Sequence, residues 1–236
     1  MDSELKRPRP PKKDLSWFQL IIFAIVVFVA TMLVMTFVVS KDTVTGPSME
    51  PGLSTGDRMI SLQHKNVKRN SIVVLHAPDR ASKEYLAKHQ SDIANITFVG
   101  NGKLFNGDSL VPLKDRELYI KRVIGLPGDT VESKHDKLYV NGKKVAQPYL
   151  DKAFSDAALK RYNMSKGLTE KYFTEDFSLD TLASTHTHRV PAGHYFVMGD
   201  NRIISHDSTD FGFVPKENIQ SVVVMRYWPL TSIKFY

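Results

Sequence analysis

The sequence predicts a mainly β protein that follows a single N-terminal membrane-spanning helix. Two observations predict this fold class. The run Trp17–Val39 contains no charged side chain, and the chain after it consists largely of short β-branched or alternating runs separated by Gly/Pro turns. The 236 residues together carry a net charge of +7 and have a mean hydropathy of −0.24. Such averages are typical of a soluble basic protein. They hide the apolar run, because it is averaged with a long polar chain.

This apolar run is long enough to cross a membrane. Its 23 residues would form a helix of about 35 Å, and a hydrocarbon core is about 30 Å thick. A cleavable signal peptide has a shorter apolar region that ends in a small-x-small site, whereas this run ends in Val-Val-Ser-Lys-Asp. A buried core helix of this composition would need a much larger domain around it. We therefore expect residues 17–39 to be a transmembrane anchor.

The flanking charges predict the orientation of the anchor. Residues 1–16 carry five Lys/Arg against three Asp/Glu, whereas the flank after the run has only Lys41 and Asp42. The positive-inside rule then places the basic tail in the cytoplasm and residues 40–236 on the other side of the cell membrane. Pro-Arg-Pro-Pro at residues 8–11 is typical of a disordered lead-in. The chain is thus expected to be a single-pass membrane protein.

The exported part is expected to be a series of strands and turns. In chain order, the strand-like runs are Ser71–Leu75, Glu117–Ile124, two short runs within Lys137–Val145, His194–Met198 and Ser221–Trp228. Asn141-Gly142 is the strongest hairpin signal, because a type I′ turn needs positive φ at both central residues. Leu126–Asp129 and Pro191–Gly193 are expected turns.

Two polar stretches interrupt this pattern, at residues 80–116 and 151–188. Both are rich in Lys, Ser, Thr and Asp and have little periodicity, although Ser82–His89 and Ser155–Tyr162 fit short helices. We interpret both stretches as insertions on the β core. Loops of this length are often functional or mobile.

The composition excludes several kinds of site. Since the chain has no cysteine, it has no disulfide scaffold, no Cys-ligated metal and no thiol nucleophile. It also contains no HExxH, Gly-rich phosphate loop or GxSxG motif. His186 and His188 would share one face of a strand, but no third ligand has a suitable spacing. We expect no metal and no cofactor.

Ser205-His206-Asp207 contains the residue types of a catalytic triad. Neighbours in an extended chain point to opposite faces, so His206 cannot lie between the other two side chains. The adjacency therefore argues against a Ser-His-Asp enzyme.

A serine and a lysine remain as candidates for chemistry. Ser48 lies within Thr45–Gly52, where Gly and Pro would hold its hydroxyl in a fixed turn beside exposed backbone N–H groups. Such a serine is more often structural, and it needs a base. Lys121 lies in the strand-like run Leu118–Ile124, where burial would lower its pKa toward the working pH. The alternative is a lysine whose amine reaches solvent at a sheet edge.

Four stretches occur in the order found in a known family. They are Gly46–Pro51 with Gly56-Asp57; Ser71–Val74; Tyr119–Asp129; and Met198–Arg202 through Ser205–Ser208 to Gly212–Val214. In these stretches the chain resembles the bacterial type I signal peptidases, which are membrane-bound endopeptidases with a Ser/Lys dyad. With the anchor and the Leu138–Lys143 hairpin, the likeness covers nearly the whole chain apart from the two insertions. The third and fourth stretches together are highly specific.

The resemblance implies roles for particular residues. Ser48 would be the nucleophile, Lys121 the general base, and Ser205 the residue that orients the lysine amine. Asp207 would belong to a supporting polar network near Arg122. The oxyanion would be held by the Ser48 N–H, and the oxyanion and substrate-strand region comprises Gly46, Pro47 and Met49.

The resemblance also implies a fold and a substrate. The family has two antiparallel sheets, with the dyad in a groove that pairs with an extended peptide. Two small pockets select small side chains at the first and third positions before the cut. The expected partners are signal-peptide-bearing preproteins and the lipid bilayer, with no nucleic acid.

Two departures from the family pattern concern single residues. Gly46 has no hydroxyl where Gram-negative relatives often have a second serine that donates to the oxyanion, which is similar to the Gram-positive branch, as is the single anchor. Thr209 stands where the family usually has Arg, so an ion pair with Asp207 is missing. Either Arg122 or Arg202 replaces it, or Asp207 is satisfied by hydrogen bonds.

A third departure is Ile203-Ile204, which replaces a polar pair before Ser205. Two apolar side chains at this point are expected to alter the packing beneath Lys121.

Two other classes of function stay open. A non-proteolytic relative, acting as a chaperone or assembly factor for secreted or pilus proteins, is suggested by Thr209 and the polar insertions, although the chain keeps Ser48 and Lys121. A binding module for anionic lipid or wall polymer is suggested by 27 Lys/Arg against 22 Asp/Glu in residues 40–236. An excess of this size is typical of a solvated surface.

Overall fold

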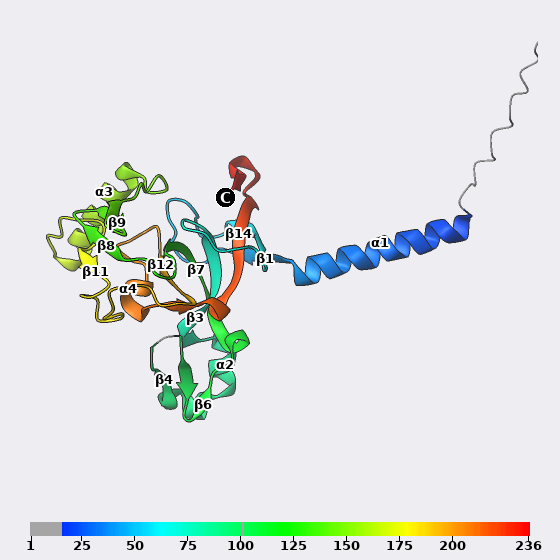
Figure 1. Ribbon diagram of the computed structural model, residues 1–236, viewed down its shortest axis with the longest axis horizontal. Coiled ribbons are helices and arrows are strands. Elements are labelled where there is room, and N and C mark those ends of the chain that lie inside the picture. Colours follow the sequence, from blue (N-terminus) through cyan, green and yellow to red (C-terminus); the bar gives the residue numbers. More distant parts are fainter. Residues whose placement is uncertain (1–15, 101) are drawn as a thin grey trace, which may run out of the picture. The chain divides into compact units, whose positions relative to one another are not determined.

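The computed structural model describes residues 16–100 and 102–236, and the chain divides into two units, residues 1–38 and 39–236. The first unit contains α1 (Trp17–Phe37), which is labelled in Figure 1. Ser16 caps its N-terminus in a capping box with Gln19. The side chains of residues 17–36 are exposed on every side, and this segment is long and apolar enough to span a membrane.

The helix is shorter than the predicted span of residues 17–39. It ends at Phe37, and Val39 already begins the first strand, where it pairs with Leu62. Valine fits a membrane helix and a strand equally well, so hydropathy placed the end two residues too far. The basic tail up to residue 15 and its Pro-Arg-Pro-Pro segment lie outside the described residues.

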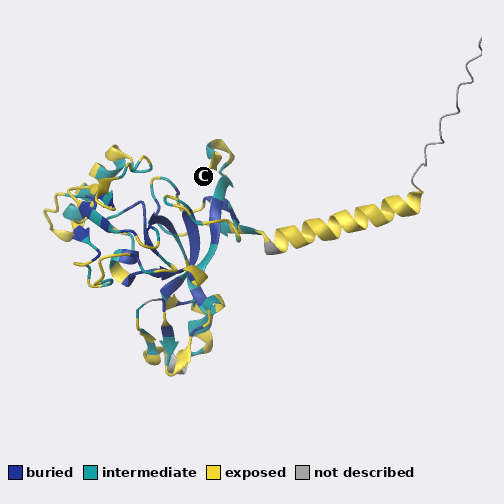
Figure 2. Cartoon of the chain, viewed as in Figure 1, coloured by how far each residue is buried: buried dark blue, intermediate teal, exposed yellow. Residues whose placement is uncertain are grey.

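The second unit is mainly antiparallel β, as the sequence predicts. Its main sheet has eight strands in the order β1-β2-β14-β3-β7-β12-β13, with β15 paired to β14 (Figure 1). The bounds are β1 (Val39–Thr43), β2 (Arg58–Leu62), β3 (Ile72–Ala81), β7 (Arg116–Gly125), β12 (His194–Met198), β13 (Val214–Pro215), β14 (Ile219–Trp228) and β15 (Lys234–Phe235). The strands expected from the sequence at β3, β7, β12 and β14 are all present. β3, β7 and β12 form the buried centre of the unit (Figure 2).

A second sheet contains the predicted hairpin. Its four strands follow the order β10 (Lys143–Lys144), β9 (Lys137–Val140), β8 (Val131–Lys134) and β11 (Phe177–Ser178). Asn141 and Gly142 have φ of 52° and 71°, which confirms the turn with positive φ at both positions. A core cluster around Phe196, Ile124 and Leu138 joins this sheet to the main one.

The first insertion has more regular structure than its sequence suggests. α2 (Lys83–Lys88) is capped by Ser82, as expected, and 3-10 turns follow at Gln90–Asn95 and Leu113–Asp115. A three-stranded sheet of β4 (Ile96–Phe98), β5 (Leu104–Asn106) and β6 (Ser109–Leu110) was not predicted. Strands of two or three residues are too short to show a period of two. Leu104 and Val111 give this insertion a small core of its own.

The second insertion contributes α3 (Lys152–Lys166), which Asp151 caps and Gly167 ends. The helix is longer than the predicted segment at Ser155–Tyr162. His186 and His188 do not lie on a strand, and His188 Nδ1 pairs with Asp180 at 3.0 Å. The remaining helical elements are α4 (Ser208–Phe211) and 3-10 turns at Lys216–Asn218 and Leu230–Ser232.

Candidate active site

Lys121 lies in the middle of the main sheet. It belongs to β7, between β3, where Val73 is its partner, and β12, which pairs with the next residues of β7. The β-branched residues around it favour a strand, and two neighbouring strands bury it so that only 4% of its surface is exposed. Burial penalises the ammonium form, so the pKa of Lys121 is lowered. The structure thus excludes the alternative of a lysine that reaches solvent at a sheet edge.

Ser48 lies in a turn rather than in a regular element. Gly46 enters this turn with φ of 87°, a conformation that favours glycine. Asn201 holds the turn from the other side, because its N–H donates to Ser48 O at 3.0 Å and its Nδ2 donates to Pro47 O at 3.3 Å. Met49 anchors the turn in the core, with 1% of its surface exposed. Its side chain therefore packs with Leu53 and Ile72 as well as bordering the site.

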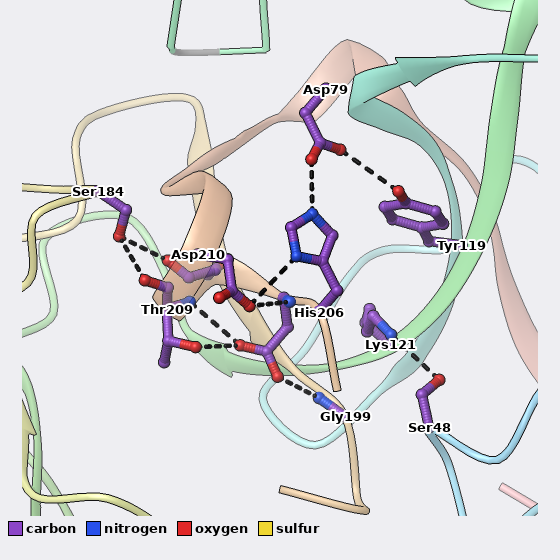
Figure 3. Close-up of polar contacts among 11 residues, drawn as sticks. Ser48, Asp79, Tyr119, Lys121, Ser184, Gly199, His206, Thr209 and Asp210 are labelled. Atoms are coloured by element: carbon purple, nitrogen blue, oxygen red, sulfur yellow. Dashed lines mark hydrogen bonds and ion pairs between the residues drawn. The ribbon is translucent and has the colours of Figure 1, made fainter. Parts of the chain in front are cut away.

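The two candidate side chains meet across the turn and the sheet. Ser48 Oγ and Lys121 Nζ lie 3.1 Å apart, although 73 residues separate them in the sequence (Figure 3). They border a cavity of about 330 Å³. Its other lining residues come from residues 41–45, which include the end of β1, and from Met49, Val74 and residues 118–120. A half-buried hydroxyl beside a buried amine is the geometry that nucleophilic catalysis by serine requires.

Four carboxylates oppose the effect of burial on Lys121. Asp207, Asp210, Asp200 and Asp79, in order of decreasing influence, raise the pKa of Lys121. Desolvation is nevertheless the largest effect and acts in the opposite direction. The negative charges of these four groups therefore offset part of the effect of burial on the amine.

Arg122 does not belong to the polar network of Asp207, contrary to expectation. Its Nε and Nη2 donate to both oxygens of Asp200, at 2.7 and 2.6 Å, and Nη1 donates to Asn70 O. The guanidinium also lies 3.9 Å from the centroid of the Tyr149 ring. Successive side chains of a strand point to opposite faces, so Arg122 faces away from the side to which Lys121 points.

Asp207 is satisfied without an arginine. Its Oδ1 accepts hydrogen bonds from Thr209 N at 3.1 Å and Thr209 Oγ1 at 2.9 Å, and its Oδ2 accepts one from Gly199 N at 2.9 Å. Arg202 does not replace the missing arginine either, since it donates to Gly199 O and to Gln147 Oε1. Hydrogen bonds from Thr209 to Asp207 thus take the place of the ion pair with arginine.

Ser205 lies beside the dyad but does not make the expected hydrogen bond to Lys121. Its Oγ is buried and has no hydrogen-bond partner among the described residues. Gly199 packs directly against it: a Cβ at this position would lie 2.6 Å from Ser48 O and closer still to Ser205 Oγ. Ser205, Gly199 and the Ser48 turn are therefore in close contact.

Ile203 and Ile204 do not pack beneath Lys121. Ile204 is 48% exposed, and both residues border a separate cavity of about 350 Å³ with Pro47, Glu50 and residues of α3. The turn at residues 202–204 directs them outward, and the turn could not be inferred from the apolar pair itself.

A further group of polar side chains lies beside the site and was not predicted. His206 lies between Asp79 and Asp210, and Tyr119 joins them (Figure 3). Asp79 and His206 are 127 residues apart, so no local pattern could connect them. In residues 16–100 and 102–236, no three His, Asp or Glu side chains are grouped so as to hold a metal ion.

Comparison with known proteins identifies similar chains. The sequence profile of the family described as "Signal peptidase, peptidase S26" matches residues 15–228. Signal peptidase IB of Staphylococcus aureus (strain MRSA252) is 33% identical over 230 residues, which are 95% of this chain and 94% of that protein. Signal peptidase I of Bacillus caldolyticus is 36% identical over 215 residues, or 88% and 91% of the two chains.

A solved structure is also similar. The crystal structure of a signal peptidase I from Enterococcus faecalis V583 has 30% sequence identity and a TM-score of 0.44, and the match covers 67% of this chain and 97% of that one.

Proposed function

Since the chain belongs to the type I signal peptidase family, peptidase S26, we propose that it is a membrane-bound serine endopeptidase that removes signal peptides from exported preproteins. The single observation that carries the proposal for the site is the 3.1 Å distance between Ser48 Oγ and the buried Lys121 Nζ. The roles of individual residues, the cleavage rule and the orientation in the membrane are parts of the same proposal.

The reaction begins with neutral Lys121. Its lone pair accepts the proton of Ser48 Oγ as this oxygen attacks the scissile carbonyl carbon. The tetrahedral oxyanion accepts a hydrogen bond from the Ser48 N–H, which lies in an irregular turn outside any strand ladder. The Lys121 ammonium then gives its proton to the leaving amine, and the C–N bond breaks. The signal peptide stays attached to Ser48 as an acyl ester.

Water completes the cycle. Lys121, neutral again, takes a proton from a water molecule that attacks the ester carbonyl. The second tetrahedral intermediate collapses and expels Ser48 Oγ, which recovers its proton from Lys121. Both residues return to their starting protonation states, so no cofactor is consumed.

The substrate lies extended in the cavity at Ser48. The cavity is lined by residues 41–45 and by residues 118–121. An extended peptide could pair with either segment. Met49, Val74 and Ile120 contribute apolar side chains to a lining that also has many polar groups, and a volume of about 330 Å³ has room for small side chains of the peptide. This supports cleavage after a small-x-small site.

The helix α1 anchors the enzyme in the cell membrane. The basic tail before it and the weakly charged flank after it favour a cytoplasmic N-terminus and an extracytoplasmic catalytic unit. In this orientation the site meets preproteins as they emerge from the membrane.

The pH profile of the full chain in detergent tests the proposal. Purified wild type should cut a reporter preprotein after a small-x-small site, and Ser48→Ala and Lys121→Ala should not. Because the reactive form of Lys121 is neutral, kcat/KM should rise with pH through the lowered pKa of Lys121 and reach a plateau above it. Cleavage that persists in both variants would exclude the proposed dyad.

A further inference from the structure

His206 is held between two carboxylates next to the dyad. Its Nε2 lies 2.5 Å from Asp79 Oδ2, and its Nδ1 lies 3.4 Å from Asp210 Oδ2 (Figure 3). Asp79 comes from the end of β3 and Asp210 from α4, so the imidazole joins two separate parts of the structure. The mechanism proposed above does not use this residue.

The geometry favours the imidazolium form of His206. An ionised carboxylate only accepts hydrogen bonds, and neutral imidazole has one donor nitrogen. Since each ring nitrogen faces a carboxylate, both nitrogens act as donors only in the imidazolium. The short contact with Asp79 accordingly raises the pKa of His206, against the smaller effect of burial.

The His206 cluster, defined here as Asp79, Tyr119, His206 and Asp210, reaches the general base through Tyr119. The Tyr119 hydroxyl donates to Asp79 Oδ1 at 3.4 Å, and the tyrosine ring packs edge-on against the imidazole at 6.2 Å between centroids. Lys121 Nζ lies 5.6 Å from the centroid of the same ring. Tyr119 thus packs against the imidazole and lies near the amine, and it also borders the cavity.

Other charges also act on the cluster, since Glu117 raises the pKa of Tyr119 and Arg80 lowers it. Arg80, beside Asp79 on β3, lowers the pKa of His206. Of the four carboxylates that raise the pKa of Lys121, Asp200 is paired with Arg122 and Asp207 accepts hydrogen bonds from Thr209 and Gly199.

The other two carboxylates, Asp79 and Asp210, both face His206. Their influence on Lys121 therefore depends on the charge of the imidazole.

We propose that His206 is a positioning residue for the reaction: its imidazolium offsets the charges of Asp79 and Asp210 beside Lys121 and keeps Tyr119 in place, so that Lys121 remains neutral at the working pH. This inference rests on the proposed function and deepens it. Loss of the imidazolium charge leaves two carboxylates uncompensated, and these stabilise the Lys121 ammonium.

The first experiment compares pH profiles of kcat/KM for the full chain in detergent. His206→Gln removes the charge and keeps a donor toward Asp79. We expect the rising limb to move to higher pH by about half to one unit, with roughly 3- to 10-fold less activity on that limb and an unchanged plateau. His206→Lys retains a positive charge and should keep the limb closer to that of the wild type.

A rescue variant separates charge from packing. In His206→Gln with Asp79→Asn, one negative charge is removed together with the positive one, so the limb should return toward the wild-type position. The matched control is His188→Gln, which removes another imidazole that pairs with an aspartate, Asp180, in a largely exposed position. It should leave the profile unchanged.

A second variant and a second readout keep the test independent of folding and of activity. Asp210 is exposed, and Asp210→Asn removes a charge that raises the pKa of Lys121, so the limb should move to lower pH. Nitrogen NMR shifts of His206 should show that the imidazolium loses its proton at a higher pH in the wild type than in Asp79→Asn, because the contact with Asp79 raises the pKa of His206.

The outcomes distinguish this inference from the proposed function. If the wild type fails to cut the reporter, or Ser48→Ala still cuts it, the proposed function is wrong. If the wild type cuts it and depends on Ser48, but His206→Gln has the wild-type profile or only a lower plateau, the role of His206 is wrong. Loss of the His206 proton at the same pH in the wild type and in Asp79→Asn would also overturn it.

Discussion

The two members of the proposed dyad are held in opposite ways. Lys121 is part of β7, a strand with hydrogen-bonded neighbours on both sides. Ser48 lies in a turn that depends on Asn201 for its contacts with the rest of the site and on Met49 for its place in the core. The proposed base is therefore part of the main sheet, whereas the proposed nucleophile is attached to the sheet at a few points.

This difference follows from what each group must do. A lysine acts as a base only when burial lowers its pKa, and the centre of a sheet supplies that burial. A nucleophilic hydroxyl must meet the substrate, which a half-buried turn allows. Changes on the Lys121 side should therefore affect protonation and stability, and changes on the Ser48 side should affect geometry with little effect on stability.

The largest effect is expected for Lys121→Met, which keeps the volume but removes the amine. Reporter cleavage should fall by about 10⁴-fold, because the serine loses its base.

Lys121→Met should not lose folding stability, although it loses activity. Since the pKa of Lys121 is lower in the folded chain, the unfolded chain binds more protons, and wild-type stability rises with pH between the two pKa values. Lys121→Met should be at least as stable at pH 7 and lose this slope. Thermal unfolding at several pH values measures it, and an unstable variant would contradict the prediction.

The next effect concerns stability on the same strand. Arg122→Met removes one partner of an ion pair in which only 7% and 1% of the two side chains are exposed. The Asp200 carboxylate is then left buried and without its counter-charge. The free energy of unfolding should fall by about 3 to 5 kcal/mol, measured by urea denaturation. Asp200→Leu added to Arg122→Met removes the unpaired charge and should recover part of the loss. If the double variant is no more stable than Arg122→Met alone, the unpaired Asp200 charge is not the cause of the loss.

On the Ser48 side, Asn201→Ala should lower activity without unfolding the chain. It removes the Nδ2 donor to Pro47 O but keeps the backbone donor to Ser48 O. We expect kcat/KM to fall about tenfold, since small displacements of a nucleophile are costly, and stability to change by about 1 kcal/mol. Asn163→Ala, which removes an amide that donates to Glu170 O in the second insertion, is the matched control. A control with the same loss of activity would exclude a local effect on Ser48.

The smallest effect is expected for Thr209→Val. The hydroxyl donor to Asp207 is lost while the backbone donor remains, so stability should fall by about 1 kcal/mol. The Asp207 charge, now less well hydrogen-bonded, should raise the pKa of Lys121 slightly and move the rising limb of activity to higher pH. Thr209→Ser keeps the hydroxyl and should match the wild type in both measurements. A normal Thr209→Val profile would mean that the backbone N–H groups of Thr209 and Gly199 are enough to satisfy Asp207.

Local patterns predicted the parts of the fold that local physics determines. The apolar run yields a helix, Asn141-Gly142 yields the hairpin, and the β-branched residues around Lys121 yield the central strand. The end of α1 was misplaced because valine suits both elements. The small sheet of the first insertion was missed because its strands are too short for periodicity.

The hydrogen-bond and ion-pair partners at the site were harder to predict from the sequence. Arg122 pairs with Asp200 rather than with the Asp207 network, and Thr209 rather than an arginine satisfies Asp207. These choices depend on which side chains meet after the sheet has formed. His206 and Asp79 are the extreme case, because neither the spacing nor the composition of their segments indicates a contact.

Gly199 restricts which positions around this site can be substituted. Any side chain at position 199 would meet Ser48 O and Ser205 Oγ, so substitution there should displace the Ser48 turn. His206 and Thr209 contact carboxylates that raise the pKa of Lys121, and the Ser48 backbone is not among their hydrogen-bond or ion-pair partners in the described residues. Selection for activity at a different environmental pH should therefore accumulate changes at 206 and 209 and leave 199 untouched. A mutational library grown under acidic and alkaline conditions would reveal this division.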